Sequence, residues 1–283
     1  MQWTVGRVRI TKIVELESIG GTRFILPQIG PEDVLKLPWM MPHFATPEGR
    51  LIMSVHSLVV ETPNRRILVD TGLGNHKKGR FVPVWNDLDT NYLEDLTSSG
   101  FPPDSIDTVL CTHLHVDHVG WNTKLVDGRW LPTFPNAKYI FGSIEYEHWK
   151  SNGKSPHSKA VFGDSVQPIV EAGLAKMVAS DAHLFDEITL IPTPGHSPGH
   201  MSVLIQSDGQ QALLTGDVAH TPAQMAHPGW SSSADSDPAQ SAATRHALFS
   251  RFADTGTLVI GGHFGAGHIQ RDGAAFKFVA LQD

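Results

Sequence analysis

The residues best suited to chemistry are histidines and aspartates that directly follow short apolar runs. Three histidines and one aspartate fall within six residues, and further members follow later runs. Together they are His113, His115, Asp117, His118, His196, Asp217 and His263. The apolar runs have the length and β-branched content of buried strands. Since sites in layered α/β folds form at the trailing ends of strands, we expect these side chains to meet there.

The spacing within this set suits two metal ions. His113 and His115 are two residues apart, so an extended turn can direct both imidazoles at one cation. Asp117 and His118 are adjacent at the start of an expected helix and can face a second cation. Asp217 lies in a tight Gly-Asp turn, where a short carboxylate could bridge both ions. We therefore assign His113, His115 and His196 to the first metal, Asp117, His118 and His263 to the second, and Asp217 to both.

Imidazole and carboxylate ligands predict two divalent ions, with zinc favoured and Mn, Fe or Co tolerated. Two such ions would lower the pKa of a bridging water and hold it as hydroxide at neutral pH. Asp117 is placed to anchor this hydroxide and to move a proton. The pattern therefore predicts hydrolysis without a covalent enzyme intermediate. The single cysteine, Cys111, lies in an apolar run and is expected to be a small buried core residue, with no internal disulfide.

Composition narrows the class of protein. The chain has 283 residues, 40% hydrophobic and 18% charged, with a formal net charge of −7. This describes a globular protein without the clustered basic residues that bind nucleic acid, and we expect the pairs Arg65-Arg66 and Lys77-Lys78 to mark solvated turns. No run approaches eighteen apolar residues and the N-terminus lacks a secretory signal pattern, so we expect no membrane partner and a cytoplasmic location.

Strand and helix patterns alternate through the middle of the chain, and strand pairs flank both ends, which predicts a mixed α/β layered fold. We expect a single domain over residues 1–283. The predicted strands are Val5–Leu16, Met53–Glu61, Arg66–Asp70, Ile106–Thr112, Lys138–Gly142, Glu187–Pro192, Ser202–Gln206, Gln211–Gly216 and Leu258–Gly262. The predicted helices are Tyr92–Ser99, Ser143–Lys150, Ser165–Val178 and Ala239–Ala253. Asp208-Gly209 is the expected turn of a hairpin.

Residues 19–50 fit neither pattern, because they are rich in Gly and Pro yet carry several large apolar side chains. We expect them to form an insertion that acts as a lid or as the contact of a homodimer. Its large side chains, with one beside the metal motif, could line an apolar pocket for a small-molecule substrate, or could simply pack into the core. They are Phe24, Trp39, Met40, Phe44 and Trp121.

The strings LVDTG, THLHVDHVG, TPGHSPGH, LLTGD and GGHF, in this order, resemble the signature of the metallo-β-lactamase superfamily. The resemblance covers nearly the whole chain and implies an αββα sandwich. It also implies that Asp70, in LVDTG, orients ligands or the first loop, although capping a strand is an alternative.

Within that superfamily the chain resembles the group of methyl parathion hydrolase and related lactonases and esterases, through GDVAH, DSDP, the segment around Arg245 and HFGAGHI. Acyl-homoserine lactonases typically carry Tyr three positions after the bridging Asp, where this chain has His220. We expect His220 to donate to a substrate carbonyl or phosphoryl oxygen, with a buried structural role as the alternative. His220→Ala should then lower turnover and leave both metals bound.

These features predict a hydrolase that uses two metals and a bridging hydroxide to cleave small, apolar esters or lactones. Organophosphate triesters are the alternative substrate class. A non-catalytic metal-binding module is the alternative of another class, and the complete set of ligands argues against it.

Overall fold

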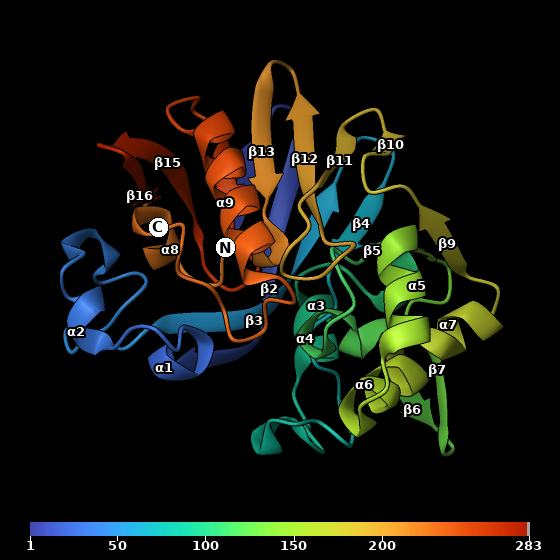
Figure 1. The fold of residues 1–283 in the computed structure, drawn as a ribbon. Helices are drawn as coiled ribbons and strands as arrows, with labels where there is room; N and C mark the ends of the chain where they lie inside the picture. Colours follow the sequence, from blue (N-terminus) through green and yellow to red (C-terminus); the bar gives the residue numbers. More distant parts are fainter. Residues whose placement is uncertain (282–283) are drawn as a thin grey trace. The chain divides into compact units, whose positions relative to one another are not determined.

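The computed structural model describes residues 1–281, and the chain divides into two compact units. Unit 1 comprises Met1–Glu15 and Val55–Ser180, and unit 2 comprises Leu16–Ser54 and Asp181–Asp283. Each unit carries its own mixed β-sheet with helices, so the α/β class predicted from the alternating patterns is confirmed (Figure 1). That the whole chain forms one domain stays a prediction.

The sheet of unit 1 has the order β1-β2-β3-β4-β5-β8-β9. Its strands are β1 (Gln2–Val5), β2 (Val8–Ile19), β3 (Ile52–Glu61), β4 (Arg66–Val69), β5 (Thr108–Leu110), β8 (Lys138–Gly142) and β9 (Ala175–Val178), and β6 (Thr123–Val126) and β7 (Arg129–Pro132) form a separate hairpin. The last residues of β2 and the first of β3 belong to unit 2. The neighbouring strands from β4 to β9 run parallel. The carboxyl ends of β4, β5 and β8 therefore lie at the same end of the sheet. The residues that follow β5 begin the histidine-rich string.

The sheet of unit 2 has the order β10-β11-β12-β13-β14-β15-β16. Its strands are β10 (His183–Phe185), β11 (Ile188–Pro192), β12 (Met201–Ser207), β13 (Gln210–Leu214), β14 (Leu258–Ile260), β15 (Ala266–Asp272) and β16 (Ala275–Ala280). Strands β13 and β14 pair in parallel, and the other neighbours are antiparallel. Because β13 and β14 run side by side in the same direction, the segments that follow them, which carry Asp217 and His263, leave the sheet at the same edge.

The helices pack on these sheets, with α5 against β8 and β9 and α9 against β15 (Figure 1). They are α1 (Thr22–Ile25), α2 (Pro31–Val34), α3 (Tyr92–Ser98), α4 (Val116–Val119), α5 (Ser143–Asn152), α6 (Pro156–Val161), α7 (Gln167–Glu171), α8 (Ala223–Ala226) and α9 (Pro238–Phe252). Helix α9 begins with Pro238 at its first position, and the Asp237 side chain accepts a hydrogen bond from the Gln240 N–H, which is a standard way to start a helix.

Most predicted elements are confirmed within a few residues, but two predictions are wrong in part. The run Val5–Leu16 is interrupted by a hairpin between β1 and β2, where Gly6 adopts a φ of 56°. The run Ser165–Val178 is a π-helical turn (Phe162–Val166), then α7, then β9. Gly173, with a φ of 69°, ends that helix early, since this conformation is unfavourable for other residues. The expected turn at Asp208-Gly209 is confirmed, with φ values of 49° and 77°.

The core of unit 2 includes much of the 19–50 segment. Met40 and Phe44 are buried in a cluster with side chains of β12 to β16 and α9, and Trp39 is half-buried against it. Phe24, by contrast, is 54% exposed. The segment is therefore anchored to unit 2 by its own apolar residues, which explains why a loop rich in Gly and Pro carries them.

Lys77 corrects the expectation of a solvated turn, because its side chain is fully buried in unit 1. Its Nζ donates to Thr123 Oγ1 at 2.6 Å and to Ser165 Oγ at 3.1 Å. Asp164 is 3.6 Å away and is held by two hydrogen bonds of 2.9 Å from Arg80. Burial lowers the pKa of Lys77 to about 7, an effect that Asp164 opposes.

The buried Lys77 should make stability depend on pH. Between pH 7 and 10 the unfolded chain keeps a proton on Lys77 that the folded chain releases, so the free energy of unfolding should rise with pH in this window. Lys77→Met should remove up to about 1.4 kcal/mol of this rise between pH 8 and 9. Urea unfolding at several pH values would measure it. The exposed neighbour offers the control Lys78→Met, and identical pH profiles in wild type and Lys77→Met would contradict the prediction.

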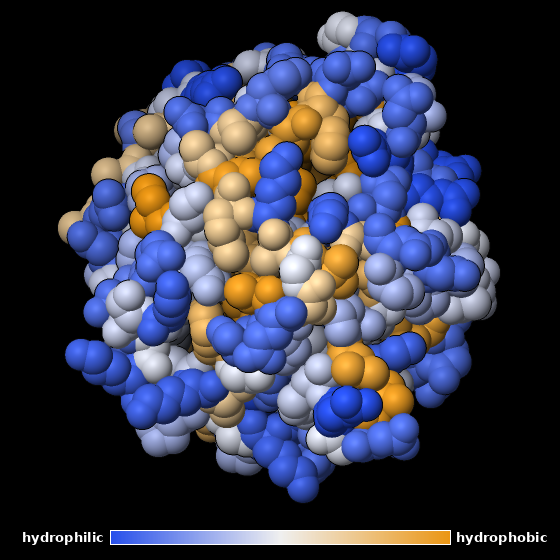
Figure 2. Space-filling view, turned by 90° about the vertical axis from the view of Figure 1, so that its right-hand side faces the viewer, coloured by the Kyte–Doolittle hydropathy of each residue, from blue (hydrophilic) through white to orange (hydrophobic). Residues whose placement is uncertain are grey.

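Exposed apolar side chains of unit 1 include Phe81, Val84 and Ile144. On the face shown in Figure 2, hydrophobic residues form groups of limited extent among hydrophilic ones. Such scattered exposure is normal for a globular surface. Within residues 1–281, no helix has the length and apolar character needed to cross a bilayer.

Candidate metal centre

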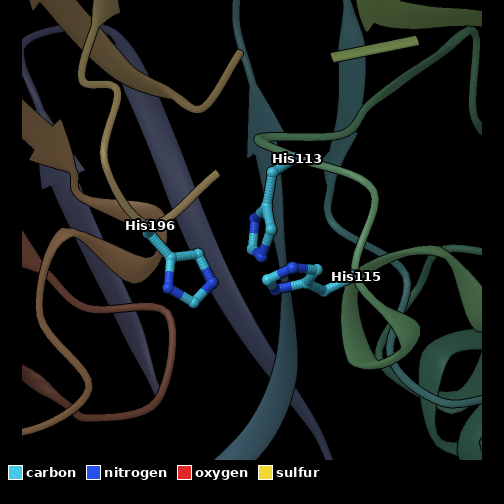
Figure 3. A group of neighbouring side chains, drawn as sticks. All are labelled: His113, His115 and His196. Carbon is cyan, nitrogen blue, oxygen red and sulfur yellow. The ribbon is translucent and has the colours of Figure 1, made fainter. Parts of the chain in front are cut away.

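In unit 1, three histidines gather on the loop after β5 and on α4. The ring centroid of His113 lies 4.6 Å from that of His115 and 4.1 Å from that of His118. Asp117 is in the first turn of α4, and its Oδ1 lies 3.8 Å from His118 Nε2. Figure 3 shows His113 and His115 projecting from this loop, and it also draws His196 on the loop after β11. The dense motif thus forms a compact group of buried or half-buried metal-ligand side chains.

Asp70, directly after β4, orients this group. Its Oδ1 accepts a hydrogen bond from the Thr112 N–H, and its Oδ2 accepts one from Thr112 Oγ1, each at 2.8 Å. His118 Nδ1 lies 2.8 Å from the same Oδ2, so Nε2 is the atom that His118 offers to a metal. Asp70 adopts a φ of 56°, an uncommon conformation for a residue with a side chain. Besides its place at the end of β4, Asp70 therefore contacts the predicted ligand His118 and the residue before His113.

Helix α5 supports the histidine loop from another direction. The Glu145 carboxylate accepts hydrogen bonds from the Leu114 N–H at 3.1 Å and from Trp149 Nε1 at 2.7 Å. The Trp149 ring in turn meets the edge of His115, with centroids 5.3 Å apart. One buried carboxylate therefore holds both the backbone between the two histidines and the aromatic ring beside one of them. Sequence reasoning missed Glu145, since a lone Glu in a helix pattern gives no signal.

The Trp121 side chain is buried in unit 1, where it contacts Tyr92 and Glu15. Its ring stacks on Tyr92 at 5.5 Å, and its Nε1 donates to Glu15 at 2.7 Å. Glu15 also accepts the N–H groups of Leu73 and Gly74, and its burial raises its pKa, which these donors partly offset. This network ties the loop after Asp70 to the segment after α4, and it was not predicted.

In unit 2, the carboxylate of Asp217 is surrounded by imidazoles. Its Oδ2 lies 3.1 Å from His263 Nε2, 3.2 Å from His220 Nε2 and 3.5 Å from His196 Nε2. All four side chains are buried. The donor atoms of His196, Asp217 and His220 all lie within 4.8 Å of one another, a separation that one metal ion can span. Unit 2 therefore brings together the three residues predicted from its strand ends and adds His220.

The backbone around Asp217 leaves little freedom. A Cβ at residue 262 would overlap Asp217 Oδ1, so only glycine fits beside the carboxylate. The Gly262 N–H donates to the Gly216 carbonyl, and the Asp217 N–H donates to His200 Nε2. His200, the last residue of the TPGHSPGH string, is thus a positioning group that sequence reasoning did not assign.

His196 and His263 are held through their Nδ1 atoms. His196 Nδ1 lies 3.0 Å from Asp235 Oδ1, and His263 Nδ1 lies 3.1 Å from the Ser54 carbonyl, so both offer Nε2 to a metal. Burial favours the neutral form of Asp235, but the hydrogen bond from His196 and nearby positive charges outweigh it and lower the pKa of Asp235 to about 2. Metal-binding histidines in proteins are oriented in this manner, so the donor set fits divalent metals such as zinc.

Asp235 is itself held by Arg245 of α9, and both side chains are fully buried. Arg245 Nη2 lies 3.4 Å from Asp235 Oδ2, and the guanidinium also donates to the carbonyls of Val218, Pro228 and Trp230. The guanidinium thereby connects the segment that follows Asp217 to the loop that precedes α9. In the sequence, the DSDP string and Arg245 indicate a family group and give no sign of this contact.

Comparisons with known proteins agree with this picture. A family model of the metallo-beta-lactamase superfamily matches residues 52–263. An N-acyl homoserine lactonase of a Bacillus species is 28% identical over 189 residues, which cover 62% of this chain and 68% of that protein. The crystal structure of hydrolase AbOPH of the beta lactamase superfamily matches 100% of this chain and 97% of its own, with a TM-score of 0.81 and 23% identity. AidC, a dizinc quorum-quenching lactonase, covers the same shares with a TM-score of 0.78 and 21% identity.

The matched region starts at the first residue of β3 and ends at His263, so it contains every ligand predicted from the motifs. The two solved structures show the fold that the motif order implies. The lactonase relative agrees with the lactonase side of the predicted resemblance. The chain belongs to the metallo-β-lactamase superfamily and is one of its metal-dependent hydrolases.

Proposed function

We propose that this protein hydrolyses small, fairly apolar lactones or esters with two bound divalent metal ions, which we assign as zinc. The observation that carries the proposal is that three buried imidazoles, His118 in unit 1 and His196 and His263 in unit 2, are held by an acceptor at Nδ1 and so present Nε2. The lactonase activity of the Bacillus relative supports the choice of lactones.

We assign the ligands as the motif spacing indicates. One metal takes His113, His115 and His196, the other takes Asp117, His118 and His263, and Asp217 serves both. The convergence of three Nε2 atoms on Asp217 Oδ2 supports the shared role of this carboxylate. Three carboxylates position the ligands. Asp70 orients the ring of His118 and Asp235 that of His196, and Glu145 holds the backbone between His113 and His115.

The metals would supply a bridging hydroxide as the nucleophile and polarise the substrate carbonyl. Asp117, on the first turn of α4, is the side chain that we assign to anchor the attacking water and to carry its proton to the leaving oxygen. No covalent bond to the enzyme is required. Phe24 and Trp39 are more accessible than the other predicted pocket side chains, and we assign them to the apolar part of the substrate. Met40 and Phe44 instead have core partners.

Metal analysis followed by a substrate panel tests this function. We expect about two metal ions per chain, and turnover of a γ-lactone with an apolar acyl chain that chelation abolishes and zinc restores. The panel should also contain an aryl ester and a dialkyl aryl phosphate triester, since His220 replaces the Tyr typical of acyl-homoserine lactonases. Preference for the triester would favour the phosphotriesterase alternative. Two bound metals with no turnover of any member would instead support a non-catalytic metal-binding module and refute the proposal.

A further inference from the structure

Unit 2 contains one more imidazole at Asp217 than the seven-ligand assignment uses. His196, His220 and His263 all direct Nε2 at the same carboxylate oxygen, at distances from 3.1 to 3.5 Å. His196 and His263 each donate through Nδ1 to an acceptor, so their neutral rings present the lone pair of Nε2 to Asp217 Oδ2, and two acceptor atoms cannot hydrogen-bond to each other. A cation that lies between these atoms would be bound by the Nε2 atoms and by Asp217 Oδ2 together.

His220 is buried in direct contact with His196, Asp217 and His263. It is 2% exposed, its ring stacks on His263 with centroids 5.5 Å apart, and it meets His196 at 4.9 Å. Its backbone N–H donates to Gln224 Oε1 at 2.8 Å, which fixes the residue after the Asp217 turn. Its Nδ1 is buried and has no hydrogen-bond partner within the described residues. The polar contact of the ring is therefore made through Nε2, toward Asp217.

This orientation argues against the predicted contact with substrate. The Nε2 atom faces the carboxylate of Asp217, and Nδ1 is enclosed by protein atoms. Neither nitrogen is presented as a donor for a carbonyl oxygen unless the ring turns.

We propose that His220 is a metal ligand through Nε2, sharing with His196 and Asp217 the ion that we assigned to His113, His115 and His196. Its donor atom lies within 4.8 Å of those of His196 and Asp217, as a common ion requires. The inference rests on the proposed metal centre and departs from the expectation that His220→Ala leaves both metals bound. Because His220 lacks the acceptor at Nδ1 that His196 has in Asp235, it is the weaker of these two ligands.

Metal affinity measured without substrate tests the inference. Wild type, His220→Ala, His220→Gln and His196→Ala are loaded with zinc, dialysed against graded concentrations of a chelator and analysed for metal content. We expect one of the two ions to bind at least about tenfold more weakly in both His220 variants, and more weakly still in His196→Ala. His268→Gln removes a half-buried imidazole bonded to the Thr257 carbonyl, away from Asp217, and should keep wild-type affinity.

A second readout needs only the wild-type protein. With cobalt in place of zinc, the exchangeable ring N–H protons of ligand histidines give shifted NMR signals, and we expect six where the seven-ligand set predicts five. Two ions held with unchanged affinity in both His220 variants, or five signals in wild type, would overturn the inference while leaving the proposed function intact. A wild type that binds no metal would overturn both.

Discussion

Asp217→Asn should lose metal and activity together. The substitution keeps the size of the side chain but removes the charge that faces three imidazoles, so the neutral amide is a poor ligand for two cations. Loss of a residue that merely orients a ligand lowers metal affinity or activity by about 10–100-fold. Asp217 is assigned as a ligand of both ions, so its loss should have a larger effect. We therefore expect turnover to fall by at least about 100-fold, with fewer than two ions bound per chain.

Metal content and turnover of the same preparations would measure the effect of Asp217→Asn. Asp208→Asn is a matched control, because it makes the same chemical change in the hairpin turn between β12 and β13. Asn accepts the positive φ of that turn, so the control should keep both ions and full activity. If Asp217→Asn retained two metals and wild-type turnover, the shared role of this carboxylate would be refuted.

Asp235→Ala should weaken both the metal site and the fold. It removes the acceptor that orients His196, for which a loss of about 10–100-fold in metal affinity or activity is typical. It also removes the carboxylate beside the fully buried Arg245, and breaking a buried ion pair from one side costs about 3–5 kcal/mol. Arg245 keeps its carbonyl partners, so we expect the lower end of that range.

Chemical denaturation and metal analysis of Asp235→Ala should be paired with two other variants. Asp235→Asn keeps an acceptor for His196 and should lose less activity than the alanine variant. Asp237→Ala removes a carboxylate two residues away that caps α9, and it should cost about 1 kcal/mol while leaving metal content and turnover unchanged. The role assigned to Asp235 would be wrong if its alanine variant matched Asp237→Ala in metal affinity and turnover.

The strands that deliver the site could be read from the sequence because their signal is local. Arg66–Val69, Lys138–Gly142 and Leu258–Ile260 consist mainly of aliphatic and aromatic residues, which favour strands. The hairpin at Asp208-Gly209 follows from the preference of these residues for positive φ. Each of these features depends on a few neighbouring residues, so no tertiary contact was needed to predict it.

Predictions failed where packing between distant segments overrides local pattern. Lys77 belongs to a pair of basic residues that normally mark a turn in water, yet Thr123, Asp164 and Ser165 enclose it. The last residues of the helix predicted from Ser165 to Val178 instead form β9, which pairs with β8. A strand at a sheet edge is selected by its neighbour strand, and that neighbour lies more than thirty residues earlier in the chain.

The sequence by itself determined the superfamily and the histidines and aspartates that offer metal ligands, because those residues follow strands at characteristic spacings. Only the tertiary structure decided how the rings are aimed. His196 and Asp235 are 39 residues apart, and Leu114 and Glu145 are 31 apart, so nothing in the local pattern pairs them. The position of His220 was decided in the same way. Its type and spacing suggested a donor for substrate, whereas the turn after Asp217 buries the ring and directs Nε2 at the carboxylate.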